Sequence, residues 1–121
     1  VPVLRPNEAM LSEALRHGQR IGMLATFAPT VPALEAELRD LDPRVSIKAV
    51  CVPEAMTALD SGDKSTHDRL LALAAPRLGT CDVVMLAQFS MAGAREAVAK
   101  AISCPVLTSP DSAVLRLREL L

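Results

Sequence analysis

Hydroxyl-bearing residues follow three short apolar runs of the sequence, where helices are expected to begin. They are Thr26 with Thr30, Ser90 just after Gln88, and Thr108 with Ser109. The first turn of a helix leaves backbone N–H groups unpaired and carries a partial positive charge, so polar side chains there suit a carboxylate or a phosphate. The chemistry that these residues indicate is the binding of a small anion.

Each hydroxyl taken alone has a simpler interpretation. Thr30, Ser90 and Ser109 each stand where Ser or Thr commonly caps a helix, and a cap needs no ligand. Their expected convergence on one edge of a sheet is therefore more informative than any one of them. Both interpretations stay open for each residue.

No side chain in this set is an obvious general base. His17 and His67 have no partner at a spacing typical of metal ligands, and we expect both on helix surfaces. Cys51, Cys81 and Cys104 are widely spaced without a C-x-x-C pair, so each is interpreted as a small buried hydrophobic side chain. The sequence therefore predicts neither a metal site nor a disulfide framework, and a reducing cytoplasm is the expected setting.

Composition narrows the class of partner. The 121 residues carry a net charge of −1, and the two aromatic residues are both Phe, which argues against nucleic acid. No apolar run approaches the roughly 18 residues needed to span a bilayer, and no signal-peptide pattern is present. No G-x-G-x-x-G or Walker loop occurs, which argues against dinucleotides and nucleoside triphosphates. We expect no cofactor.

Hydrophobic periodicity and turn residues predict four strands that alternate with helices. The strands are expected at 21–26, 45–52, 81–88 and 104–108. Helices are expected at 7–17, 30–41, 54–59, from 65 to a break at Pro76, at 90–102 and from 109 onward. The run at 83–87 is wholly apolar, as in a strand buried on both faces, whereas 45–48 alternates, as expected nearer a sheet edge.

Such an alternation predicts an α/β fold. Right-handed crossovers place helices on both faces of a four-stranded, mainly parallel sheet, which gives three layers. The carboxyl ends of all four strands then meet at one edge, where open α/β sheets bind their ligands. The polar junctions described above all fall on that edge.

Four stretches resemble the second domain of the Asp/Glu/hydantoin racemase superfamily and the helix that enters it. They are RPNEAMLSEAL, IGMLATFAPTVPALEAEL, VVMLAQFSMA and CPVLTSPDSAV. Members of that superfamily consist of two similar, flavodoxin-like α/β domains that hold the substrate between them. The resemblance implies that residues 1–108 form a second domain and that 109–121 form a last helix that packs on a first domain. We therefore expect the chain to be a fragment of a two-domain protein.

The resemblance also suggests roles for individual residues. It places Thr26 and Thr30 at carboxylate-binding positions, and it places Gln88 where the second-domain catalytic Cys usually stands, with Ser90 after it. A thiolate can remove a proton and return it, whereas a neutral amide only donates or accepts hydrogen bonds. Racemisation by two thiols would therefore lack one base here. Many relatives carry a Glu after the second strand, and Glu54 lies one residue later than that position.

Three functions remain open. The resemblance implies a cofactor-independent racemase- or isomerase-type enzyme that acts next to the carboxylate of a small amino- or hydroxy-acid-like substrate, with the isolated chain inactive. The alternative is a non-catalytic carboxylate-binding or dimerisation domain that lost its thiol. A flavodoxin-like signalling or flavin-binding domain is disfavoured, because neither Trp nor Tyr occurs in the chain. We also expect a homodimer or domain-swapped assembly through the apolar face of the last helix, which carries Val114, Leu117, Leu120 and Leu121.

Overall fold

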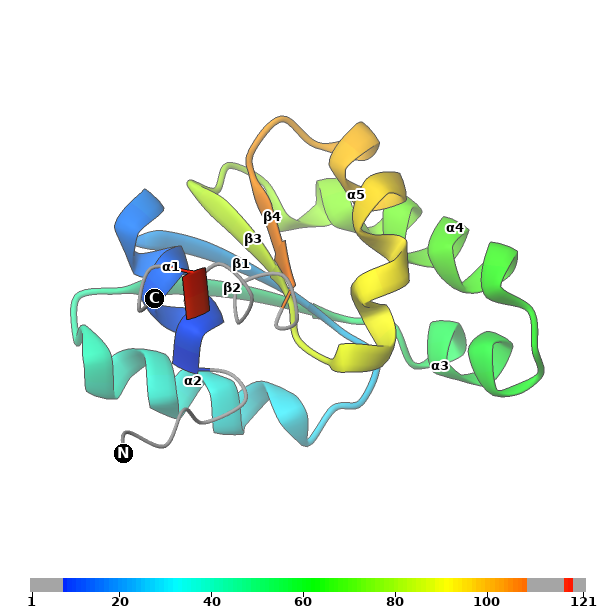
Figure 1. Ribbon diagram of the computed structural model, residues 1–121, viewed down its shortest axis with the longest axis horizontal. Helices are drawn as coiled ribbons and strands as arrows, with labels where there is room; N and C mark the ends of the chain where they lie inside the picture. The colour runs from blue at the N-terminus through cyan, green and yellow to red at the C-terminus, as the bar shows by residue number, and fades with distance from the viewer. Residues whose placement is uncertain (1–7, 109–116, 119–121) are drawn as a thin grey trace.

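The structure is a computed structural model and describes residues 8–108 and 117–118. Four parallel strands form one sheet in the order β2-β1-β3-β4, with helices on both faces (Figure 1). The elements are α1 (Glu8–His17), β1 (Arg20–Ala25), α2 (Thr30–Leu41), β2 (Ser46–Cys51), α3 (Pro53–Asp60), α4 (Lys64–Ala74), the 3₁₀ helix η1 (Ala75–Leu78), β3 (Val83–Leu86), the 3₁₀ helix η2 (Phe89–Ala94), α5 (Arg95–Ala101) and β4 (Val106–Thr108). The predicted α/β class is confirmed.

Two separate cores lie on the two faces of the sheet. Odd-numbered strand residues such as Met23 and Met85 pack with α1 and α2 on one face. Even-numbered ones such as Leu24 and Leu86 pack with the layer formed by α3, α4 and α5 on the other. Successive side chains of a strand point to opposite faces, so a single strand supplies both cores.

Burial along the strands follows the predicted pattern. All four residues of β3 are buried, whereas burial alternates along most of β2, which is an edge strand. The strands themselves are shorter than predicted: β3 ends at Leu86 and β4 begins only at Val106. The polar junction after β3 therefore begins earlier than predicted.

Several predicted helix starts are wrong. The N-cap of α2 is Pro29, so Thr30 is the first helical residue and its side chain does not cap the helix. The cap of α4 is Asp63, whose carboxylate accepts from Thr66 N at 3.0 Å. The break at Pro76 is confirmed, because α4 ends at Ala74 and Pro76 lies in η1.

The helix predicted at 90–102 is divided into η2 and α5, and Ser90 does not cap it. A 3₁₀ helix has three residues per turn, so residues i and i+3 lie on the same side. Met91 and Ala94 are such a pair, and both are fully buried. Both side chains belong to the core on the α3, α4 and α5 side of the sheet.

Most predictions for the chain termini fall on residues outside the described ranges. The predicted cap at Asn7 and the start of the last helix at Ser109 lie outside the described residues. Leu117 and Arg118 are helical, and Leu117 is 51% exposed. None of the helices within the described ranges has the length and apolarity that a membrane crossing requires.

Candidate functional site

The pairing register of β1 with β3 brings Thr26 and Gln88 to the same place. The ladder pairs Leu24 with Leu86, and Ala87 N continues it by donating to Leu24 O at 2.9 Å. Thr26 lies two residues beyond Leu24, and Gln88 lies two residues beyond Leu86. Each therefore follows the end of its own strand, and the two are neighbours. Thr26 is 2% exposed, although it follows the end of its strand.

Three donors converge on the side-chain oxygen of Gln88. Thr26 N donates to Gln88 Oε1 at 2.7 Å, Thr26 Oγ1 at 2.8 Å and Phe27 N at 3.0 Å. Backbone N–H groups can face only an acceptor, so the network fixes which end of the amide is the oxygen. The site is a tight arrangement of two successive backbone N–H groups and one hydroxyl around a single oxygen.

Such an arrangement is suited to an anion. Hydrogen bonds to a charged acceptor are roughly twice as strong as those to a neutral one. A carboxylate oxygen in the place of Gln88 Oε1 would receive the same three bonds. We call the three donors Thr26 N, Thr26 Oγ1 and Phe27 N the oxygen cradle.

The other predicted site residues that the structure describes differ in burial. Thr108 is buried at the end of β4, opposite Leu86. Thr30 is half-buried and Ser90 exposed, and neither side chain forms a hydrogen bond within residues 8–108. Ser109 lies outside the described residues. The cradle hydrogen bonds join Thr26 and Phe27 to Gln88.

Cys51 and Glu54 also lie at this edge. Cys51 is the last residue of β2, and Glu54 is exposed in the first turn of α3. Burial raises the pKa of the Cys51 thiol, and the nearby Glu54 carboxylate raises it further. A thiol with a raised pKa is a poor nucleophile and a poor base at neutral pH.

His67 was predicted at a helix surface, and this is wrong, because the residue is only 1% exposed. Its ring packs inward from the same face of α4 as Leu71 and Ala74, which are also buried. That i, i+4, i+7 spacing is visible in the sequence and is the signal that could have predicted the burial. The corresponding expectation for His17 is confirmed, because it is exposed.

A polar chain runs from His67 to η2. His67 Nδ1 lies 2.8 Å from Asp68 Oδ1, and Lys64 Nζ donates to Asp68 Oδ2 at 2.6 Å and to Gly93 O at 3.3 Å. Burial alone would raise the pKa of Asp68, but the bonds from Lys64 and His67 lower it on balance. This chain attaches α4 to η2, the helix that directly follows Gln88.

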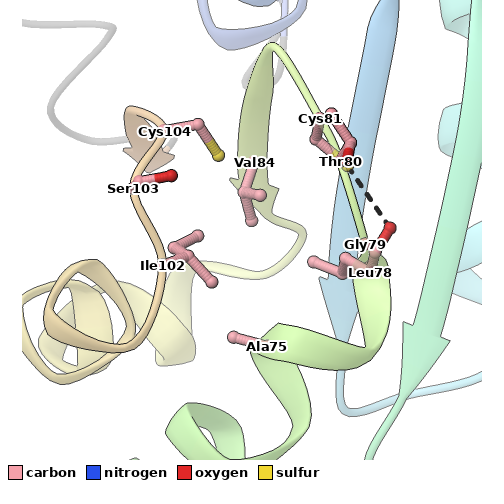
Figure 2. A pocket seen from close by; sticks show the side chains of 9 residues that line it. All are labelled: Ala75, Leu78, Gly79, Thr80, Cys81, Val84, Ile102, Ser103 and Cys104. Carbon is pink, nitrogen blue, oxygen red and sulfur yellow. Dashed lines mark hydrogen bonds between the residues drawn. The ribbon is translucent and has the colours of Figure 1, made fainter.

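The opposite edge of the sheet contains a cavity of about 210 Å³, lined by residues that precede β3 and β4. In Figure 2, Val84 lies between Cys81 and Cys104 on its wall. Cys81 Sγ donates to Leu78 O at 3.6 Å, and burial raises the pKa of both thiols. This cavity is remote from the oxygen cradle along the strand direction. Within the described part of the chain, no group of three or more His, Cys, Asp or Glu residues could hold a metal ion.

The sequence was also compared with models of protein families. The family model described as Asp/Glu/Hydantoin racemase matches residues 1–117. This range contains β1, β3 and the oxygen cradle between them. No curated protein matches the chain.

Proposed function

This chain belongs to the Asp/Glu/hydantoin racemase family, and on that premise we propose that it supplies one wall of a site for a small amino- or hydroxy-acid-like carboxylate. Family membership supports a racemase- or isomerase-type function. In the proposed reaction, the carbon next to the bound carboxylate loses and regains a proton without a cofactor. A second, facing domain would supply the other wall.

The observation that carries this proposal is the oxygen cradle. Thr26 N, Thr26 Oγ1 and Phe27 N approach one oxygen within 2.7–3.0 Å, at the carboxyl edge of a parallel sheet. A substrate carboxylate held there gains charge-assisted bonds and a defined orientation of its neighbouring carbon. Thr30, Ser90 and Thr108 belong to the same edge and would border the rest of the substrate.

Gln88 limits the chemistry that this chain performs by itself. A carboxamide has no useful acid–base function near neutral pH, so Gln88 does not abstract the proton. The base would be a thiol or carboxylate on the facing domain. One-base isomerisation or decarboxylation fits this arrangement better than racemisation by two thiols.

A second candidate function rests on the same residue. A domain that kept the cradle and has an amide in place of a base would bind a carboxylate without transforming it. Such a domain would serve as a binding or dimerisation module. The neutral side chain at Gln88 is the specific observation in its favour.

One experiment tests the proposal and separates the two candidates. Small dicarboxylic amino and hydroxy acids are titrated into the ¹⁵N-labelled 121-residue chain, and solvent-deuterium incorporation next to the carboxylate is followed in parallel. We expect saturable shifts of the Thr26 and Phe27 amide resonances without exchange, and exchange once the full gene product is used. Binding without exchange in the full gene product would favour the second candidate. Absence of any shift at Thr26 and Phe27 would overturn both.

A further inference from the structure

We propose that Gln88 is an internal competitor for the oxygen cradle, so that the chain closes its own carboxylate site until a ligand displaces the amide. This inference rests on the proposed function, because it assigns the cradle to a carboxylate. It adds a self-inhibitory contact made by one side chain of the same domain.

The side-chain oxygen of Gln88 occupies the position in the cradle that a ligand oxygen would take. Its oxygen accepts from all three cradle donors at 2.7–3.0 Å. A carbonyl oxygen has two lone pairs, and three bonds leave it saturated. A second oxygen cannot enter the cradle while this one remains, because both would need the same three hydrogens.

The Gln88 side chain also lies where it can leave the cradle and enter solvent. Gln88 is only partly buried, and the neighbouring Phe27 is 50% exposed. No hydrogen bond from Gln88 Nε2 is recorded within residues 8–108. Displacement of the amide therefore breaks the three bonds to its oxygen and exposes polar atoms that water can solvate.

The acceptor strengths decide the direction of the competition. An incoming carboxylate replaces a neutral oxygen by a charged one, which forms the stronger bonds. The internal amide has the advantage of being tethered, so it holds the cradle whenever free carboxylate is scarce. A ligand that binds only the open form shows an affinity reduced by the open fraction. If fewer than about one molecule in ten is open, the apparent affinity falls at least about tenfold.

A series of substitutions at Gln88 tests this competition. Acetate is titrated into the full 121-residue chain, with the amide resonances of Thr26 and Phe27 as the readout. Gln88→Ala removes the internal oxygen and should bind acetate at least about tenfold more tightly than the unchanged chain. Gln88→Glu replaces the internal oxygen by a charged one and should bind acetate more weakly than the unchanged chain. Gln19→Ala is the matched control, because Gln19 is an exposed glutamine at the opposite end of β1, and its affinity should not change.

The outcomes separate the two proposals. Equal acetate affinity in Gln88→Ala and the unchanged chain, with shifts at Thr26 and Phe27, would overturn the internal competition and leave the carboxylate site intact. Absence of binding at these amides in every variant would overturn the site itself. If Gln88→Ala fails to fold, Gln88→Glu still decides, because acetate binding as tight as in the unchanged chain would contradict the competition.

Discussion

Asp82 forms hydrogen bonds with Arg20 through both its side chain and its backbone, at the amino end of the β1–β3 pair. Arg20 N donates to Asp82 Oδ2 at 3.0 Å, Arg20 Nη2 to Asp82 Oδ1 at 2.9 Å, and Asp82 N donates back to Arg20 O at 2.7 Å. Thr26 and Gln88 are hydrogen-bonded at the carboxyl end of the same strand pair, and they too are 62 residues apart in the sequence. Asp82 and Gln88, which lie on either side of β3, thus accept hydrogen bonds from the backbone at the start of β1 and just after its end.

The Arg20–Asp82 contact predicts a pH dependence of stability. Hydrogen bonds from the Arg20 side chain and backbone hold the pKa of Asp82 below its ordinary value. A carboxyl group whose pKa is lower in the folded than in the unfolded chain stabilises the fold at any pH above its pKa in the unfolded chain, which is about 3.9. That contribution is lost as the pH falls through the pKa of the folded chain. Asp82→Asn should therefore be less stable than the unchanged chain at pH 7.

The difference should shrink below about pH 4 and vanish in stronger acid, where both side chains are neutral. Urea unfolding midpoints measured between pH 7 and pH 2 give this comparison. Asp60→Asn is the control, since Asp60 is an exposed aspartate at the end of α3. A difference that stays constant across the whole pH range would refute the electrostatic explanation.

Removal of either partner in the Thr26–Gln88 contact should destabilise the fold by different amounts. Thr26→Val deletes one of three bonds and should lower the free energy of unfolding by about 0.5–1.5 kcal/mol. Gln88→Met leaves all three donors without their acceptor and should cost about 1–3 kcal/mol. In the double variant the two losses should not add, because the hydroxyl bond is already absent in Gln88→Met. Additive losses in denaturant unfolding would mean that the two side chains act independently.

His67 is a buried polar side chain that the fold should tolerate losing. Its Nε2 is buried without a hydrogen-bond partner among the described residues. An unsatisfied buried polar atom costs about 1–3 kcal/mol, and a hydrogen bond to a charged group, such as that from Nδ1 to the Asp68 carboxylate, contributes about 1.5–3 kcal/mol. The two contributions nearly cancel, so His67→Leu should change the free energy of unfolding by no more than about 1 kcal/mol in either direction.

The neighbouring core position provides the contrast. Leu71 is fully buried on the same helix, and Leu71→Ala should lower the free energy of unfolding by about 2–5 kcal/mol. Both variants can be followed by chemical denaturation with circular dichroism. A loss of several kcal/mol in His67→Leu would mean that the contact with Asp68 or the shape of the ring outweighs the unpaired nitrogen.

Substitution of Gly22 by alanine should destabilise the fold, because the added methyl group has no room. A Cβ there would lie 2.9 Å from Cys81 Sγ and 3.1 Å from Val84 Cγ2. Overpacking costs about 1–3 kcal/mol, which exceeds the gain of about 0.5–1 kcal/mol from replacing a glycine within a strand. Gly22→Ala should lower the thermal midpoint, and Cys81→Ala in the same chain should restore part of it by removing the sulfur. If the second substitution restores nothing, crowding at Cys81 is not the cause.

Local sequence determined the elements of this fold and their order. A run of apolar residues at 83–87 predicts a strand buried on both faces, and alternation near Ile47 predicts an edge strand, because each pattern reflects its immediate environment. Pro76 predicts the end of α4 for an equally local reason, since its ring and missing N–H cannot continue the helix. These features depend on neighbours a few residues apart.

The contact between Thr26 and Gln88 was decided by tertiary structure. Both residues were predicted to belong to the site, but their direct bond depends on the register of two strands that are separated by 62 residues. Two of the three cradle donors are backbone N–H groups, which every residue except proline possesses, so side-chain types do not reveal them. Which oxygen fills the cradle was likewise decided only when β1 and β3 paired and set the Gln88 amide above the end of β1.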